Sequence, residues 1–96
     1  MNFHFHPEAA VEVETAALHY EEHGPGLRGD FLSELEFTIN RIIERPWAWG
    51  RISPNERRCR MGRFPYGVVY RILDDEIEIV AVMHLHREPG YWAGRA

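Results

Sequence analysis

The stretch from Arg60 to Arg95 reads R-M-G-R-F-P-Y-G-V-V-Y-R-I-L-D-D-E-I-E-I-V-A-V-M-H-L-H-R-E-P-G-Y-W-A-G-R. It holds two largely apolar runs, residues 66–73 and 77–86, on either side of an Asp-Asp pair, which predicts two antiparallel strands joined by a tight turn. The second run is apolar in its middle and ends in histidine and arginine. We therefore expect the last strand to carry titratable and cationic side chains from the core to the rim of a sheet, where a site can form.

Alternation along the last strand predicts which side chains share a face, because successive residues of a strand point to opposite sides. One face is predicted to carry Ile77, Ile79, Ala81, Met83 and Leu85. The other is predicted to carry Glu78, Val80, Val82, His84 and His86. On this second face polar residues gather at the end, so His84 and His86 are expected to project together, with Arg87 beside them.

The cluster at the end of the strand allows two interpretations. Histidine titrates near neutral pH and arginine stabilises anionic transition states, so His84, His86 and Arg87 could orient a phosphate or act in acid and base catalysis. Alternatively, these groups bond to acids such as Glu88 or to neighbouring backbone and have a structural role. Two aromatic residues follow; we expect Trp92 to pin the tail onto the helices and Tyr91 to line the site.

Metal binding is the other use of the His-x-His pattern, which occurs at His4/His6 and at His84/His86. A tetrahedral site needs further ligands, and no cysteine or carboxylate stands at a recognisable spacing. The sequence also lacks a phosphate-binding glycine loop, a nucleophile elbow and a Ser/His/Asp set. We expect no metal and no cofactor, and we expect Cys59, the only cysteine, to be a buried structural thiol.

The residues before Arg60 predict the remaining elements. Phe3 and Phe5 alternate with polar residues, which suits a short half-buried strand. Apolar residues at helical spacing then predict helices over 7–23 and 27–44, and the break between them predicts an antiparallel hairpin. Residues 46–56 read as a loop. The fold class is therefore α+β: an N-terminal strand, a two-helix antiparallel hairpin, then a three-stranded antiparallel meander forming one sheet packed against the helices, in a single domain over residues 1–96.

Arginine and tryptophan residues flank the start of the meander. Arg58 and Arg60 should point outward from one sheet face and, with Arg57, form a basic ridge that would suit RNA backbone, an acidic partner segment, or only solvent. Trp47 and Trp49 could contact a partner, although at least one is expected to seal the core beneath the loop.

Charge is unevenly distributed along the chain. The net charge is −4, but residues 1–44 hold nine acidic residues against two arginines, whereas residues 45–96 hold nine arginines against six acidic residues. The acidic total argues against strong nonspecific binding to nucleic acid and makes a protein partner more plausible. The first residues lack the features of a signal peptide and no apolar run is long enough to span a membrane, so a soluble cytoplasmic protein is expected.

The order of elements, with R-x-M-G-R-F-P-Y-G-V-V-Y-R-I followed by I-E-I-V-A-V-M-H-L-H-R-E-P-G-Y-W, resembles the RelE/ParE superfamily of bacterial toxins. The resemblance covers nearly the whole chain, and its specific part runs from Arg60 to Trp92. It implies a small α+β toxin of a type II toxin–antitoxin module, neutralised by a cognate antitoxin whose C-terminal segment wraps the toxin. A homodimer or a heterotetramer with the antitoxin is compatible with this resemblance.

Two activities divide this superfamily. ParE-like members poison DNA gyrase, whereas RelE-like members cleave mRNA in the ribosomal A site, so the target is gyrase or the ribosome with its mRNA. For cleavage, the resemblance implies Arg60 or Arg63 on the phosphate, His84 or His86 for proton transfer, and Tyr91 as the C-terminal tyrosine of such nucleases. Arg87 is a further candidate catalytic residue from the chemistry of the cluster, because arginine stabilises an anionic transition state. Leu85 stands where one cation of the nucleases is expected, which together with the acidic net charge favours the ParE-like activity. A non-toxic interaction module is a third hypothesis.

Overall fold

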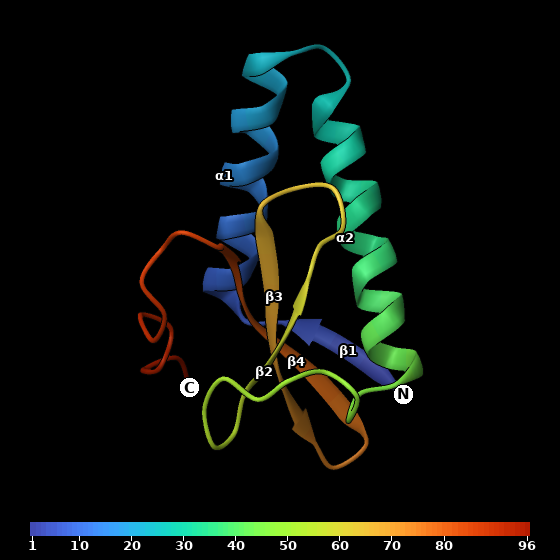
Figure 1. Ribbon diagram of the computed structural model, residues 1–96, viewed down its shortest axis with the longest axis vertical. Helices are drawn as coiled ribbons and strands as arrows, with labels where there is room; N and C mark the ends of the chain where they lie inside the picture. The colour runs from blue at the N-terminus through green and yellow to red at the C-terminus, as the bar shows by residue number, and fades with distance from the viewer.

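The computed structural model describes residues 1–96 and contains two helices and four strands (Figure 1). Their order along the chain is β1 (Asn2–Phe5), α1 (Pro7–His23), α2 (Leu27–Glu44), β2 (Arg57–Arg60), β3 (Tyr66–Leu73) and β4 (Glu76–His84). The predicted α+β fold is confirmed, including the strand that precedes the helices. Neither helix is long and apolar enough to cross a membrane.

The four strands form one sheet in the order β1-β4-β3-β2. The meander β2-β3-β4 is antiparallel, and β1 pairs with β4 in parallel, with Phe3 opposite Ile77 and Phe5 opposite Ile79. Parallel pairing is possible here because the helical hairpin lies between the two strands in sequence and supplies the long connection that it requires. In Figure 1 the helices lie behind the sheet, while the loop before β2 and the C-terminal tail lie in front of and beside it.

Local sequence signals place the helix ends. The ring Nδ1 of His6 accepts a hydrogen bond from the amide of Glu8 at 3.1 Å, and Pro7 occupies the first turn of α1, where its missing N–H costs nothing. Gly26 precedes α2 with φ +86°, a left-handed conformation that glycine adopts without strain. Both helices have the predicted boundaries.

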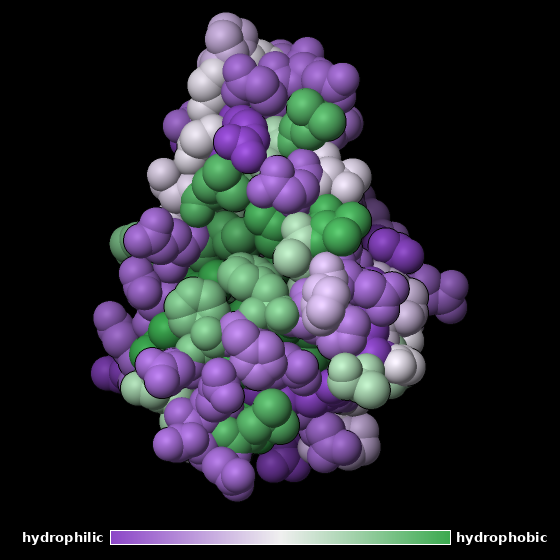
Figure 2. All heavy atoms as spheres, turned by 180° about the vertical axis from the view of Figure 1, so that it is seen from behind, coloured by the Kyte–Doolittle hydropathy of each residue, from purple (hydrophilic) through white to green (hydrophobic).

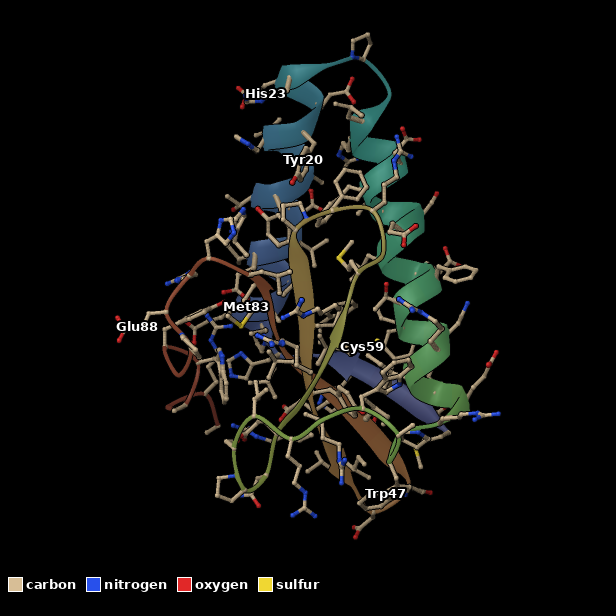
Figure 3. All side chains as sticks on the ribbon, viewed as in Figure 1. Tyr20, His23, Trp47, Cys59, Met83 and Glu88 are labelled. Atoms are coloured by element: carbon tan, nitrogen blue, oxygen red, sulfur yellow. The ribbon has the colours of Figure 1, made fainter.

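The main core lies between the helices and the sheet. It contains buried residues of α1, α2 and the meander: Ala9, Val13, Ala16, Ala17, Phe31, Leu35, Ile39, Ile42, Cys59, Met61, Phe64, Val68, Tyr70, Ile77, Ile79 and Val82. Toward the helix turn the core becomes aromatic, and Tyr20 packs there against the rings of Phe31, Phe64 and Tyr66 (Figure 3). Cys59 is buried as predicted, and burial raises the pKa of its thiol.

A smaller core covers the helix-free face of the sheet. Trp92 is 2% exposed and packs on Val69, Val80, Ala81 and Met83. The prediction that Trp92 pins the tail is confirmed, but it packs on the sheet and not on the helices. This second apolar surface exists because β3 and β4 are apolar on both faces.

A β-bulge in β4 overturns part of the predicted alternation. The register shifts between Val69 and Tyr70, which pair with Ala81 and Ile79, so Val80 has no partner on β3. Val80 and Ala81 consequently both belong to the helix-free core, and Val82 returns to the helix face with Ile77 and Ile79. The inserted residue changes the side on which every later side chain lies.

Strand β4 also ends earlier than predicted, at His84 and not at His86. The chain turns at residues 85–87, where the amide of Arg87 donates to the carbonyl of His84 at 3.0 Å. His86 is therefore a turn residue, and the expectation that it extends the strand face of His84 was wrong.

The loop before β2 places its two tryptophans differently. Trp49 packs against the main core, which confirms that one of the pair seals it, whereas Trp47 is 65% exposed and stands at the foot of the molecule (Figure 3). The guanidinium of Arg57 holds the loop, because it donates to the carbonyls of both tryptophans at 3.2 and 2.7 Å.

Candidate functional site

The end of β4, the N-terminal part of α1 and the tail enclose a hollow of about 280 Å³, which we call the rim hollow. Its lining residues come from three separate parts of the chain: Val11, Glu12, Thr15, Tyr66, Val82, Met83, His84, Arg87 and Tyr91. The bulge in β4 decides this arrangement, because it turns Val82 and the side chain of His84 toward the helix face. The fold thus brings three predicted site residues together: His84, Arg87 and Tyr91.

Glu12 of α1 organises the rim hollow. Its Oε1 accepts from the amide of Val82 at 3.0 Å and from the guanidinium of Arg95 at 2.9 Å. Its Oε2 accepts from the Tyr91 hydroxyl at 2.7 Å and from Arg95 at 3.0 Å, while Arg87 lies 3.9 Å away. One carboxylate therefore joins α1, β4 and the tail, and the bidentate Arg95 pair is the strongest geometry for such a contact.

The Tyr91 hydroxyl is hydrogen-bonded to this carboxylate. Burial, and then the hydrogen bond to Glu12, raise the pKa of Tyr91 far above its ordinary value. The guanidinium of Arg87 lies 3.5 Å from the centre of the Tyr91 ring, a cation–π contact. A tyrosine with a raised pKa is a poor proton donor to a substrate, and its hydroxyl proton already has an acceptor in Glu12.

The two histidines are neighbours at the edge of the hollow. Their ring centres are 5.1 Å apart, and the ring of His84 also meets the edge of Tyr66 at 5.2 Å. The backbone amide of His86 donates to Nδ1 of His84 at 3.1 Å, which leaves Nε2 of His84 without a protein partner. Glu88, the predicted acidic partner, points away from the molecule (Figure 3).

The remaining two predicted site residues lie outside the rim hollow. Arg63, in the turn after β2, pairs with Asp30 of α2 at 3.3 Å. Arg60 lines a different hollow, at the edge of the sheet. The structure therefore divides the predicted set between separate surfaces.

Sequence reasoning missed Glu12, although the pattern contained a signal. Glu12 lies three residues after Ala9 and four before Ala16, both of which are buried. Residues at these spacings share one helix face, so a glutamate there is directed toward the core and needs a partner. The partner, Arg95, is 83 residues away in sequence.

Seen from behind, the molecule carries an apolar groove of about 320 Å³ between β1 and α2 (Figure 2). Its lining is mainly aliphatic and aromatic: Phe3, Phe5, Leu32, Leu35, Glu36, Ile39 and Asn40. Figure 2 shows apolar side chains gathered on this face between the two helices. Phe3 is 40% exposed there, so the groove is an open apolar surface and not part of the closed core.

The order of strand, helical hairpin and antiparallel meander is the one expected from the resemblance to the small α+β toxins of type II toxin–antitoxin modules. The model of the family "ParE toxin of type II toxin-antitoxin system, parDE" matches residues 3–89. The chain belongs to this family and is a toxin of the ParDE type, a class that is paired with a cognate antitoxin.

Solved structures agree with the fold. A chain from the chromosomal ParDE toxin–antitoxin system of P. aeruginosa superposes with a TM-score of 0.64 at 18% identity, covering 88% of this chain and 95% of that one. No curated protein shows significant similarity to the sequence.

Proposed function

We propose that this toxin arrests bacterial growth by inhibiting DNA gyrase in the cytoplasm, as a binding protein and not as a nuclease. The observation that carries the proposal is the hydrogen bond of the Tyr91 hydroxyl to Glu12 at 2.7 Å. General acid–base catalysis needs a group free to exchange a proton with the substrate near the operating pH. The resemblance to RelE-like nucleases implies that Tyr91 acts in catalysis. Its hydroxyl is hydrogen-bonded to the Glu12 carboxylate, however, and its pKa is raised.

The division of the cations supports the same proposal. Cleavage of RNA needs an arginine at the scissile phosphate close to the groups that move protons. Arg63 is paired with Asp30, Arg60 lies outside the rim hollow, and Arg87 rests on the Tyr91 ring. The two histidines are the titratable groups of the rim whose rings have no hydrogen bond to another side chain.

Ribosome-dependent mRNA cleavage is the second candidate function. It is favoured by one observation, the free Nε2 of His84 in a hollow that Arg87 also lines. In this alternative His84 transfers the proton and Arg87 leaves the Tyr91 ring to contact the phosphate.

The apolar groove supports a proposal for neutralisation. An amphipathic helix placing its apolar face against Phe3, Leu32 and Ile39 would cover side chains that are otherwise in water. We propose that the antitoxin docks there, consistent with wrapping of the toxin by an antitoxin segment.

Two assays with the purified toxin separate the candidate targets. Gyrase supercoiling of relaxed plasmid should be inhibited in proportion to toxin concentration, and programmed ribosomes should show no A-site cleavage. The variants His84→Ala and Arg87→Ala should arrest growth as the parent does if neither group is catalytic. Cleavage that is abolished by either variant would overturn the gyrase proposal and establish the nuclease.

A further inference from the structure

The arginines of this chain divide into two groups. Five pair with carboxylates of the protein: Arg28, Arg63, Arg71, Arg87 and Arg95. The other six have no carboxylate oxygen within 4.0 Å, and all lie between residues 41 and 60: Arg41, Arg45, Arg51, Arg57, Arg58 and Arg60. An acidic protein thus concentrates its unpaired cations in one segment.

Four of the unpaired arginines line one hollow of about 460 Å³. We call it the arginine hollow, and it is lined by Arg41, Trp49, Gly50, Arg51, Ile52, Arg58 and Arg60. No acidic residue lines it. Four guanidinium groups around one concave surface repel one another, and an anion in the hollow would relieve this repulsion.

Arg41 is held at the wall of this hollow and leaves one buried donor unpaired. Its Nη2 donates to the carbonyl of Arg60 at 3.1 Å, and its guanidinium lies 5.6 Å from the centre of the Trp49 ring. Its Nε is buried and has no hydrogen-bond partner. A buried donor without an acceptor is uncommon in native structures.

The strand beneath the hollow is suited to an extended ligand. β2 is the last strand of the sheet, and Arg58 and Arg60 lie on its helix-free side, since Arg58 pairs with Val69. Side chains two residues apart on a strand repeat at roughly 7 Å, which is also the repeat of alternate side chains in an extended peptide. Gly67 on β3 leaves room for the Arg58 stem, because a Cβ there would stand 2.8 Å from Cδ.

We propose that the arginine hollow binds an extended acidic segment of a partner protein, with carboxylates on alternate residues meeting Arg58 and Arg60 and an apolar residue resting on Trp49. Guanidinium groups bind carboxylates through two parallel hydrogen bonds. The inference goes beyond gyrase inhibition and stands whichever target the toxin has.

The charge of the whole chain favours a peptide over a nucleic acid. Polynucleotides bind through phosphates spread over a long basic surface, and their affinity depends on the number of cations along it. Here the net charge is −4, and the acidic residues 1–44 would repel a long polyanion. A short segment that ends within the hollow avoids this repulsion.

Calorimetric titration of the full chain at low salt tests the proposal. The probes are an end-capped peptide of alternating Glu and Val, about ten residues long, its Gln–Val counterpart, a single-stranded RNA of similar length, and inorganic phosphate. The Glu peptide should bind at least about tenfold more tightly than each of the other three.

Matched variants locate the binding. The double variant Arg58→Gln/Arg60→Gln should weaken binding of the Glu peptide by about tenfold or more. Arg45→Gln, which removes an unpaired, exposed arginine outside the hollow, should change it less than about twofold. Arg51→Gln changes a hollow residue in the loop before β2 and repeats the test, should the double variant fail to fold.

Three results would overturn the proposal. RNA binding as tightly as the Glu peptide would make the hollow a nucleic-acid site. Equal dissociation constants for the Glu and Gln peptides would show that the carboxylates do not contribute to binding. Equal losses in Arg45→Gln and Arg51→Gln would show attraction by the general charge of the segment and no built site.

Discussion

Glu12 is the residue that assembles the rim. Its side chain is 16% exposed and that of Arg95 is 10% exposed, so their ion pair is shielded from solvent. The same carboxylate also satisfies the Val82 amide next to the bulge and the Tyr91 hydroxyl. A single acidic side chain on α1 therefore fixes the path of the last strand and of the tail.

Replacing Glu12 tests this role. Glu12→Ala leaves the largely buried Arg95 guanidinium with only the exposed Glu8 carboxylate, at 3.7 Å, as an ionic partner. Breaking a buried ion pair costs about 3 kcal/mol of the free energy of unfolding. The matched variant Glu14→Ala removes a pair whose side chains are 68% and 47% exposed, and should cost less than about 1 kcal/mol. Urea denaturation of the three proteins measures both differences. A loss below about 1 kcal/mol for Glu12→Ala would contradict the role assigned to it.

At the scale of elements, β1 is joined to β4 by side chains as well as by its backbone. His4 lies between two carboxylates of β4, with Nδ1 at 3.0 Å from Glu76 and Nε2 at 3.3 Å from Glu78. The hydrogen bond to Glu76, and further contacts with both acids, raise the pKa of His4. The N-terminal strand therefore binds the sheet more tightly when His4 is protonated.

This linkage predicts a dependence of stability on pH. Because the pKa of His4 is raised in the folded state, the stabilisation is fully present below the unfolded value near 6.5 and is lost as pH rises through the folded value. At acidic pH the wild type should have a free energy of unfolding up to about 1 kcal/mol larger than that of His4→Gln, and at alkaline pH the difference should be smaller. The effect is limited to this size because His4 and Glu76 are partly exposed.

Denaturation at about pH 5.5 and about pH 8.5 measures the difference between the two proteins on either side of the transition. In a Glu76→Gln background the effect of the His4 substitution should shrink, which a double-mutant cycle quantifies. A wild-type advantage that grows with pH would have the wrong sign and would exclude the linkage.

The elements also show where sequence patterns lose information. The apolar spacing of α1 and α2 and the glycine and proline signals at their ends are local, and they predicted both helices correctly. The bulge at Val80 is not visible in the sequence, because Val80, Ala81 and Val82 are all apolar and any register buries them. Where both faces of a strand are apolar, the sequence does not indicate which side chains point to which face.

At the scale of the whole molecule, different surfaces carry different chemistry. The rim hollow lies between α1 and the end of β4, the arginine hollow lies at the β2 edge, and the apolar groove lies between β1 and α2. A toxin that must be neutralised and must also reach its target can use separate surfaces for these contacts.

Substitution in the groove tests the assignment of the antitoxin surface. Phe3→Ser should weaken binding of the antitoxin encoded by the neighbouring reading frame by about tenfold or more, because a large apolar side chain that becomes buried contributes roughly 1.5–3 kcal/mol. Leu18 is also an exposed apolar residue, but it lies on α1 and outside the groove. Leu18→Ser should leave the dissociation constant within about twofold of the wild-type value. Calorimetric titration of purified toxin with antitoxin gives both values, and equal effects of the two substitutions would remove the groove from the interface.

The sequence by itself determined the order and type of the elements, the helix boundaries, the family and the buried state of Cys59, because each depends on local periodicity, on turn residues or on a contiguous motif. Only the tertiary structure decided how the predicted site is divided. The bulge in β4, the early end of that strand and the capture of Tyr91 by Glu12 each arise from contacts between residues far apart in the chain. Such contacts depend on register and on the packing of layers, and a linear pattern of residue types does not encode them locally.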